Sequence, residues 1–194
     1  MLSGREMSKQ GSDEWIEQRR GIITASRFGD VLAGKKTKRR RQYIAELRVE
    51  LSGAPMFDTS MPWHEHGAAT EEEGLGAYAW ERDVDIVRPG FIPHQTLEYV
   101  GCSPDAFVGD DGGVELKCRS SLSSHLACLK GMPATYKPQV QGCMWVTGRL
   151  WWDFCSYYRT ATAHDVIIHR VARDDDYIKK LERACKQFWS ELNG

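Results

Sequence analysis

Residues 84 to 117 are divided into short apolar segments by turn residues, and this region most constrains the fold. Each segment is too short for a typical helix, and most contain the β-branched and aromatic residues that favour strands. The sequence GDDGG at 109–113 predicts a hairpin loop between the last two segments. A sheet is therefore expected in the middle of the chain. The predicted strands are 84–87, 91–93, 99–101, 106–108 and 114–117.

The sequence on both sides of this sheet favours helices. Ser12 followed by two acidic residues is typical of a helix start, and residues 174–192 have an amphipathic helical pattern. The chain has 194 residues, which is enough for one domain with a substantial core. We therefore expect a single α/β domain, 1–194, with a central mixed sheet flanked by helices. Further helices are predicted at 24–34, 43–53, 67–80, 121–130 and 138–146, and further strands at 150–158 and 166–171.

The formal net charge of −1 conceals an uneven charge distribution. Six of the seven residues from 35 to 41 (KKTKRRR) are cationic, whereas Glu71, Glu72 and Glu73 form an acidic cluster. Local electrostatic fields therefore matter more than the total charge, and a weakly acidic pI does not exclude nucleic acid as a partner. A basic run of this kind is typical of a solvated loop.

The sequence contains no pattern typical of a membrane or secreted protein. No apolar run approaches the roughly 20 residues needed to cross a bilayer, and the first residues lack the apolar core of a signal peptide. The six cysteines include no C-x-x-C pair, so we expect small buried side chains rather than a zinc ribbon. We therefore expect a cytosolic protein with no membrane partner.

Asp105, Glu115 and Lys117 form the most informative polar group. The hairpin loop predicts that Asp105 and Glu115 lie on adjacent antiparallel strands near the same end. Because side chains alternate along a strand, Glu115 and Lys117 share one face while Leu116 points into the core. Two carboxylates and the Leu116 carbonyl could hold Mg²⁺, and Lys117 could orient or deprotonate a water or stabilise phosphate charge. The alternative is a surface salt bridge across a hairpin.

Four stretches together resemble one family. "EWIEQRRGIITASRFGDVL" from Glu14, "GCSPDAF" from Gly101, "GVELKC" from Gly113 and "PQVQGCMWVTG" from Pro138 resemble the bacteriophage lambda exonuclease family of PD-(D/E)xK nucleases. The resemblance covers about residues 12 to 158. It implies a restriction-endonuclease-like core and an enzyme that degrades linear double-stranded DNA from 5′ to 3′, leaving a 3′ single-stranded overhang.

The same resemblance implies cofactors and partners. Two Mg²⁺ ions are expected, and Mn²⁺ could replace them. The family implies a ring-shaped homotrimer around DNA ends, which acts with a single-strand annealing recombinase in phage recombination in the bacterial cytoplasm. Two rival interpretations are a structure- or sequence-specific endonuclease with the same core and a catalytically silent DNA-end-binding module.

Residue by residue, the resemblance implies that Asp105, Glu115 and the Leu116 carbonyl bind metal and that Lys117 is catalytic. Glu71 resembles the family's helix glutamate that faces the metals, although Glu72 or Glu73 could take its place.

A second group of residues resembles the family's pocket for the 5′-terminal phosphate. The guanidinium of Arg19 can donate two parallel hydrogen bonds to a phosphate, and the other members offer hydroxyl or amide groups to the anion. Gln139 could point inward instead of Gln141. In an enzyme that threads a duplex, the basic run is expected to contact DNA phosphates. The predicted pocket is Arg19, Ser26, Ser103 and Gln141, and the predicted phosphate contacts are Lys35, Lys36, Lys38, Arg39, Arg40 and Arg41.

Overall fold

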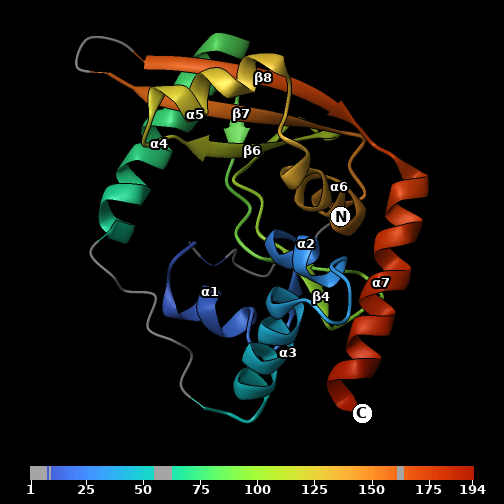
Figure 1. Ribbon diagram of the computed structural model, residues 1–194. Helices are drawn as coiled ribbons and strands as arrows, with labels where there is room; N and C mark the ends of the chain where they lie inside the picture. Colours follow the sequence, from blue (N-terminus) through green and yellow to red (C-terminus); the bar gives the residue numbers. More distant parts are fainter. Residues whose placement is uncertain (1–7, 9, 55–62, 161–163) are drawn as a thin grey trace.

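Three of the five strands predicted in the middle of the chain contribute to a mixed sheet, in a computed structural model that describes residues 8, 10–54, 63–160 and 164–194 (Figure 1). The predicted strands 91–93 and 99–101 belong instead to a separate, smaller sheet. Five strands lie in the order β2-β5-β6-β7-β8. The β6–β7 pair is parallel, and the other neighbouring pairs are antiparallel. This arrangement confirms the predicted α/β class. The strands are β2 (Ile86–Val87), β5 (Ala106–Val108), β6 (Gly112–Cys118), β7 (Trp151–Arg159) and β8 (His164–Ala172).

Helices cover both faces of this sheet. Helix α4 (Trp63–Arg82) packs so closely that a Cβ atom at Gly74 would lie 2.9 Å from Leu116 and 3.1 Å from Tyr157. The opposite face carries α5 (Leu122–Leu126) and α6 (Lys137–Thr147), and Figure 1 shows α4 passing behind the sheet with α5 in front. Since Leu116 faces α4, its neighbours Glu115 and Lys117 face the α5 side.

A smaller sheet joins the N-terminal part of the chain to the middle. Its strands lie in the order β1-β4-β3, with bounds Ile23–Thr24, Val100–Cys102 and Ile92–Pro93 respectively. Helix α7 (Asp175–Asn193) runs beside α2, α3 and α6, and together they bury the core around Phe28, Met144 and Phe188. The N-terminal helices are α1 (Asp13–Gln18), α2 (Phe28–Val31) and α3 (Lys38–Leu51).

Three local predictions differ from the structure. The predicted helix 24–34 is only partly helical: Thr24 pairs with β4 as the end of β1, Ala25–Arg27 form a 3₁₀ turn, and α2 covers only Phe28–Val31. The predicted helix 121–130 is α-helical only to Leu126 and then continues as a 3₁₀ turn. The basic run is not simply a loop, since its second half forms the first turn of α3.

Burial of the cysteines follows the sequence-based expectation with one exception. Five are buried, whereas Cys118 at the end of β6 is exposed. Within the described ranges, no helix is long and apolar enough to cross a membrane.

Candidate active site

The structure brings Asp105, Glu115 and Lys117 together at one end of the β5–β6 hairpin. Ala106 lies opposite Val114 in this pair, so the side chain of Asp105 reaches the next part of β6. Its Oδ2 accepts a hydrogen bond of 2.6 Å from the backbone N–H of Leu116. Lys117 Nζ forms an ion pair with Glu115 Oε1. Two carboxylates and one ammonium therefore meet at β6, the central strand of the sheet.

Burial opposes the negative charge of the two carboxylates. Glu115 is 0% exposed, and its Oε2 has no hydrogen-bond partner among the described residues. Burial raises the pKa of Glu115 in spite of Lys117, and burial together with the Glu115 charge raises the pKa of Asp105 to about 7. Burial alone would lower the pKa of Lys117, but the two carboxylates reverse this and raise it. Lys117 is therefore protonated and partly offsets the carboxylate charge.

Helix α4 supplies a third carboxylate, that of Glu71. Glu71 is ion-paired with Arg88, and its pKa is raised by burial and then by the neighbouring Asp105 charge. Glu72 is exposed, and Glu73 forms an ion pair of 3.0 Å with an arginine of β7. Of the three adjacent glutamates, Glu71 is the one oriented toward the carboxylate cluster.

These donors suit a hard divalent cation. Carboxylate and carbonyl oxygens are the ligands that Mg²⁺ prefers, and the unpartnered Oε2 of Glu115 is a buried acceptor that a cation would satisfy. In the part of the chain that the structure describes, no three His, Cys, Asp or Glu side chains converge into a ready-made ligand set. Here the ammonium of Lys117 supplies the positive charge beside Glu115. The residues fit a metal whose binding would rearrange this ion pair.

Three of the four residues predicted to bind the terminal phosphate lie near this site. Trp15 connects two of them, because its Nε1 donates a hydrogen bond of 3.1 Å to Ser103 Oγ. The guanidinium carbon of Arg19 lies 3.9 Å from the Trp15 ring centroid, and burial lowers the pKa of Arg19. Ser103 is separated from Asp105 by a single residue, so this cluster directly adjoins the carboxylates.

Ser26 lies at the same end of the smaller sheet as Ser103. Strands β1 and β4 are parallel with Thr24 opposite Gly101, so Ser26 and Ser103 each follow their strand at its carboxyl end. Ser26 is exposed, and its Oγ lies 3.3 Å from Thr24 Oγ1. Its hydroxyl is therefore available to a ligand at this end.

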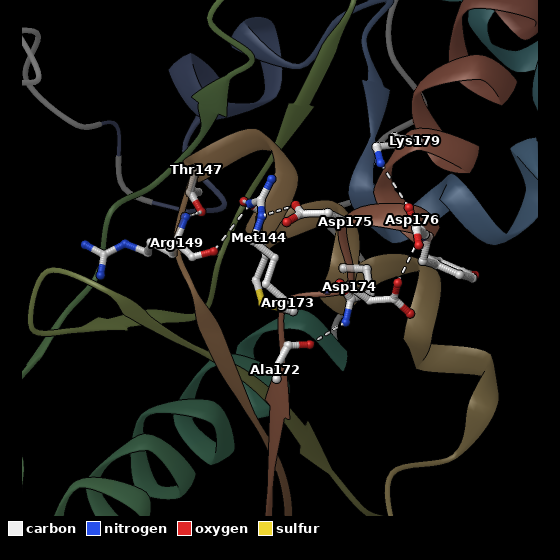
Figure 2. A network of polar contacts seen from close by, with 11 residues as sticks. Met144, Thr147, Arg149, Ala172, Arg173, Asp174, Asp175, Asp176 and Lys179 are labelled. Carbon is white, nitrogen blue, oxygen red and sulfur yellow. Dashed lines mark hydrogen bonds and ion pairs between the residues drawn. The ribbon is translucent and has the colours of Figure 1, made fainter.

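Gln141 does not belong to this pocket, which corrects the prediction from the sequence. Its side chain is 1% exposed and spans two backbone groups: Nε2 donates to Ala172 O at 2.9 Å, and Oε1 accepts from Asp174 N–H at 2.8 Å. Figure 2 shows this junction, where Arg173 also donates to Met144 O. Both ends of the Gln141 amide are thus used to join α6 to the β8–α7 connection.

Gln139 is the alternative that the sequence left open. It lies in the first turn of α6 and is partly exposed, whereas Gln141 is buried. Gln139 is therefore the glutamine of this helix whose amide is accessible to a ligand.

The basic run separates into buried and exposed cations. Arg40 is 4% exposed, donates to Val31 O and forms an ion pair of 2.8 Å with Glu191, so it fixes α3 against α2 and α7. Its predicted role as a surface phosphate contact is wrong for this reason. Lys35 also pairs with Glu191, at 2.7 Å, but it remains exposed. The other exposed cations of the run are Lys36, Lys38, Arg39 and Arg41.

Four residues near the site were missed by the sequence analysis: Trp15, Arg88, Arg119 and Tyr136. Trp15 lies in the stretch from Glu14 that resembles the exonuclease family, and Arg119 continues the alternation that places Glu115 and Lys117 on one face. These two positions carried a signal in the sequence. Arg88 and Tyr136 are brought to the site by folding, and no local pattern marks them.

The fold that carries this carboxylate–lysine cluster matches that of solved exonucleases. The alkaline exonuclease LHK-Exo from Laribacter hongkongensis superimposes with a TM-score of 0.83 and 34% sequence identity, covering 94% of this chain and 93% of that chain. Its complex with dAMP matches with the same values. A phage-related exonuclease from Haemophilus somnus 129PT shares the fold, with a TM-score of 0.66, 16% identity, and coverage of 88% of this chain and 94% of that chain.

A family model described as the YqaJ-like viral recombinase domain matches residues 14–150. The chain therefore belongs to the YqaJ-like viral recombinase family, and the resemblance to the lambda exonuclease family is confirmed. A search of curated proteins found no match.

Proposed function

We propose that this protein is a Mg²⁺-dependent 5′→3′ exonuclease that degrades one strand of linear double-stranded DNA and leaves a 3′ overhang. Membership of the viral recombinase family and the match to an alkaline exonuclease support a nuclease role in phage-type recombination. The observation that carries the finer proposal is the junction of two clusters: the carboxylates adjoin the Arg19–Ser103 cluster through Pro104. A site for a terminal phosphate beside a site for hydrolysis suits an enzyme that acts at DNA ends.

Each residue has a defined part in this reaction. Asp105, Glu115 and Glu71 would hold Mg²⁺ together with the Leu116 carbonyl, and Mn²⁺ has ligand preferences that allow it to substitute. When bound, the metal activates a water and stabilises charge on the scissile phosphate. Lys117 carries a positive charge at the same place and stabilises the charge that develops on the phosphate. Arg19, Ser26 and Ser103 would hold the 5′-phosphate, with Gln139 in place of Gln141.

The proposal includes an assembly. A homotrimeric ring around the duplex would keep the enzyme on its substrate, and a single-strand annealing recombinase would receive the 3′ overhang. Sedimentation of the purified protein with and without duplex DNA tests the ring, since a monomer in both conditions would contradict it.

Replacing Glu115 with glutamine is expected to abolish hydrolysis and most of the stabilisation by Mg²⁺. Glu115 is fully buried and its Oε2 has no hydrogen-bond partner among the described residues, so a bound cation would satisfy this oxygen, whereas a neutral amide would bind the cation poorly. Mg²⁺ should raise the Tm of the wild type by binding the folded state and should raise that of Glu115→Gln much less. Thermal denaturation with Mg²⁺ and with EDTA measures this difference.

The matched control for this variant is Glu73→Gln, which alters the partly exposed glutamate two residues from Glu71 that pairs with Arg159. Its Tm should respond to Mg²⁺ as the wild type does. An equal Mg²⁺ response in Glu115→Gln would show that Glu115 does not bind the metal.

The exposed cations at the start of α3 are expected to contact the DNA backbone. The first turn of this helix contains no acidic residue to balance its cations, and an anionic partner would relieve the unfavourable charge at the helix N-terminus. Neutralising Lys36, Lys38 and Arg41 together should weaken duplex binding and reduce the slope of log K against log salt by up to about 3, or about 0.9 for each lost phosphate contact.

The control triple is Lys179, Lys180 and Arg183, which are exposed on α7. Titrating labelled duplex at several salt concentrations compares the two variants. Equal salt slopes for the Lys36, Lys38 and Arg41 variant and the wild type would show that this segment does not contact DNA.

A further inference from the structure

The face of β6 that carries Lys117 continues to Arg119, which the proposed roles leave unexplained. Lys117 lies opposite Ser156 in the parallel β6–β7 pair. The side chains of Lys117, Arg119 and Ser156 therefore share one face of the sheet. The Nε of Arg119 donates a hydrogen bond of 3.2 Å to Ser156 Oγ. Arg119 is thus fixed by the neighbouring strand only two residues from the lysine of the candidate site.

The guanidinium of Arg119 also fixes the ring of Tyr136. Its Nη1 donates a hydrogen bond of 3.1 Å to the Tyr136 hydroxyl. The guanidinium carbon lies 5.5 Å from the Tyr136 ring centroid and 5.9 Å from that of Phe154, and the two rings are 5.1 Å apart. Both the hydroxyl and the plane of Tyr136 are therefore restrained.

The restrained ring of Tyr136 faces Lys117. The Nζ of Lys117 lies 5.4 Å from the Tyr136 ring centroid, within the range of a cation–π contact. Lysine has a flexible four-carbon side chain, so a fixed ring on one side and the Glu115 carboxylate on another limit where the ammonium can lie.

Two buried polar side chains, Ser156 and His125, support the position of Arg119. Ser156 and His125 are both 0% exposed, and His125 Nδ1 lies 3.0 Å from Ser156 Oγ. His125 Nε2 lies 3.2 Å from a carboxylate oxygen of Asp165, which is exposed. Ser121 caps the N-terminus of α5 by accepting from the N–H of Ser124, and this short helix places His125 against the sheet. These side chains form a continuous set from the surface to the site.

We propose that Arg119 is a positioning residue for Lys117: supported by Ser156 and His125, it holds the Tyr136 ring against which the Lys117 ammonium rests. This inference depends on the proposed hydrolysis at Lys117. Because a small misplacement of a catalytic group costs a large part of the rate, loosening the ring should slow the reaction without weakening DNA binding.

Arg119→Lys tests this directly, since lysine keeps the charge but lacks the planar guanidinium whose Nε and Nη1 bond Ser156 and Tyr136 separately. The expected result is about a tenfold loss of kcat on linear duplex with Mg²⁺ and an unchanged KM. Tyr136→Phe removes the hydroxyl that Arg119 bonds and keeps the ring. In a Tyr136→Phe background, Arg119→Lys should therefore have little further effect on kcat.

Arg149→Lys is the matched control. The guanidinium carbon of Arg149 lies 3.6 Å from the Phe107 ring centroid. Arg149 also donates a hydrogen bond of 2.7 Å to Gly112 O, at the other end of β6. It should alter Tm without lowering kcat. Ser156→Ala removes the hydroxyl that accepts a hydrogen bond from Arg119 Nε and should lower kcat severalfold. It provides a second test if Arg119→Lys does not fold.

Additive losses of kcat from Arg119→Lys and Tyr136→Phe would overturn the proposal, because Arg119 would then act by another route. A rise in KM with unchanged kcat, or an unchanged kcat in Ser156→Ala, would overturn it as well. These outcomes leave the proposed function intact, since the wild type would still degrade the duplex. A wild-type protein that does not hydrolyse DNA would instead overturn both.

Discussion

Lys117→Ala is expected to lower the rate of DNA hydrolysis by more than about 100-fold, because it removes the positive charge that stabilises the reacting phosphate. It should also lower the Tm, since Glu115 is fully buried and Lys117 is its ion-pair partner. Rates measured on 5′-phosphorylated linear duplex with saturating Mg²⁺, together with thermal denaturation, test both effects.

A double variant separates chemistry from folding. In Glu115→Gln with Lys117→Ala, the buried charge is removed along with its partner, so the Tm should recover while hydrolysis stays absent. Lys179→Ala is the control, because Lys179 is an exposed lysine of α7 that pairs with Asp176 at 3.0 Å. Near wild-type hydrolysis in Lys117→Ala would show that the candidate site is not the active site.

Arg19→Ala is expected to slow degradation of 5′-phosphorylated duplex by about tenfold or more and to affect dephosphorylated duplex much less. Hydrogen bonds to charged groups contribute about 1.5–3 kcal/mol, and each 1.4 kcal/mol corresponds to about a factor of ten in rate. Without the terminal phosphate, the substrate end is no longer held in register with the carboxylates. Initial rates on the two substrates measure this difference.

Arg20→Ala is a closely matched control, because Arg20 is the adjacent arginine but pairs with Glu17 and donates to Ala54 O at 2.7 Å. It should slow both substrates equally or not at all. If Arg19→Ala also slowed both substrates equally, the loss would reflect general damage and the pocket would be misassigned.

The parts of the site that were predictable depend on local geometry. A hairpin loop and the alternation of side chains along a strand are enough to bring Asp105, Glu115 and Lys117 together, and the structure shows this arrangement. The final helix was equally predictable, because an amphipathic pattern and an Asp174 cap both lie within the segment itself. Neither inference required knowledge of a distant partner.

The parts that could not be predicted depend on contacts between distant segments. Arg40 belongs to a basic run, but its role is set by Glu191, which lies 151 positions further along the chain. The choice between Gln139 and Gln141 is set by backbone groups at the β8–α7 connection. The identity of the inward glutamate at 71–73 depends on how α4 crosses the sheet, which periodicity within α4 does not determine.

Hydrolysis of end-labelled linear duplex and covalently closed circular duplex in one reaction with Mg²⁺ tests whether the protein is a 5′→3′ exonuclease. One linear substrate carries its label at the 5′ ends and another at the 3′ ends. We expect the 5′ label to be released first, the 3′ label to stay on long single strands, and the circle to remain intact. Cleavage of the circle, or release of the 3′ label before the 5′ label, would contradict the proposed exonuclease activity.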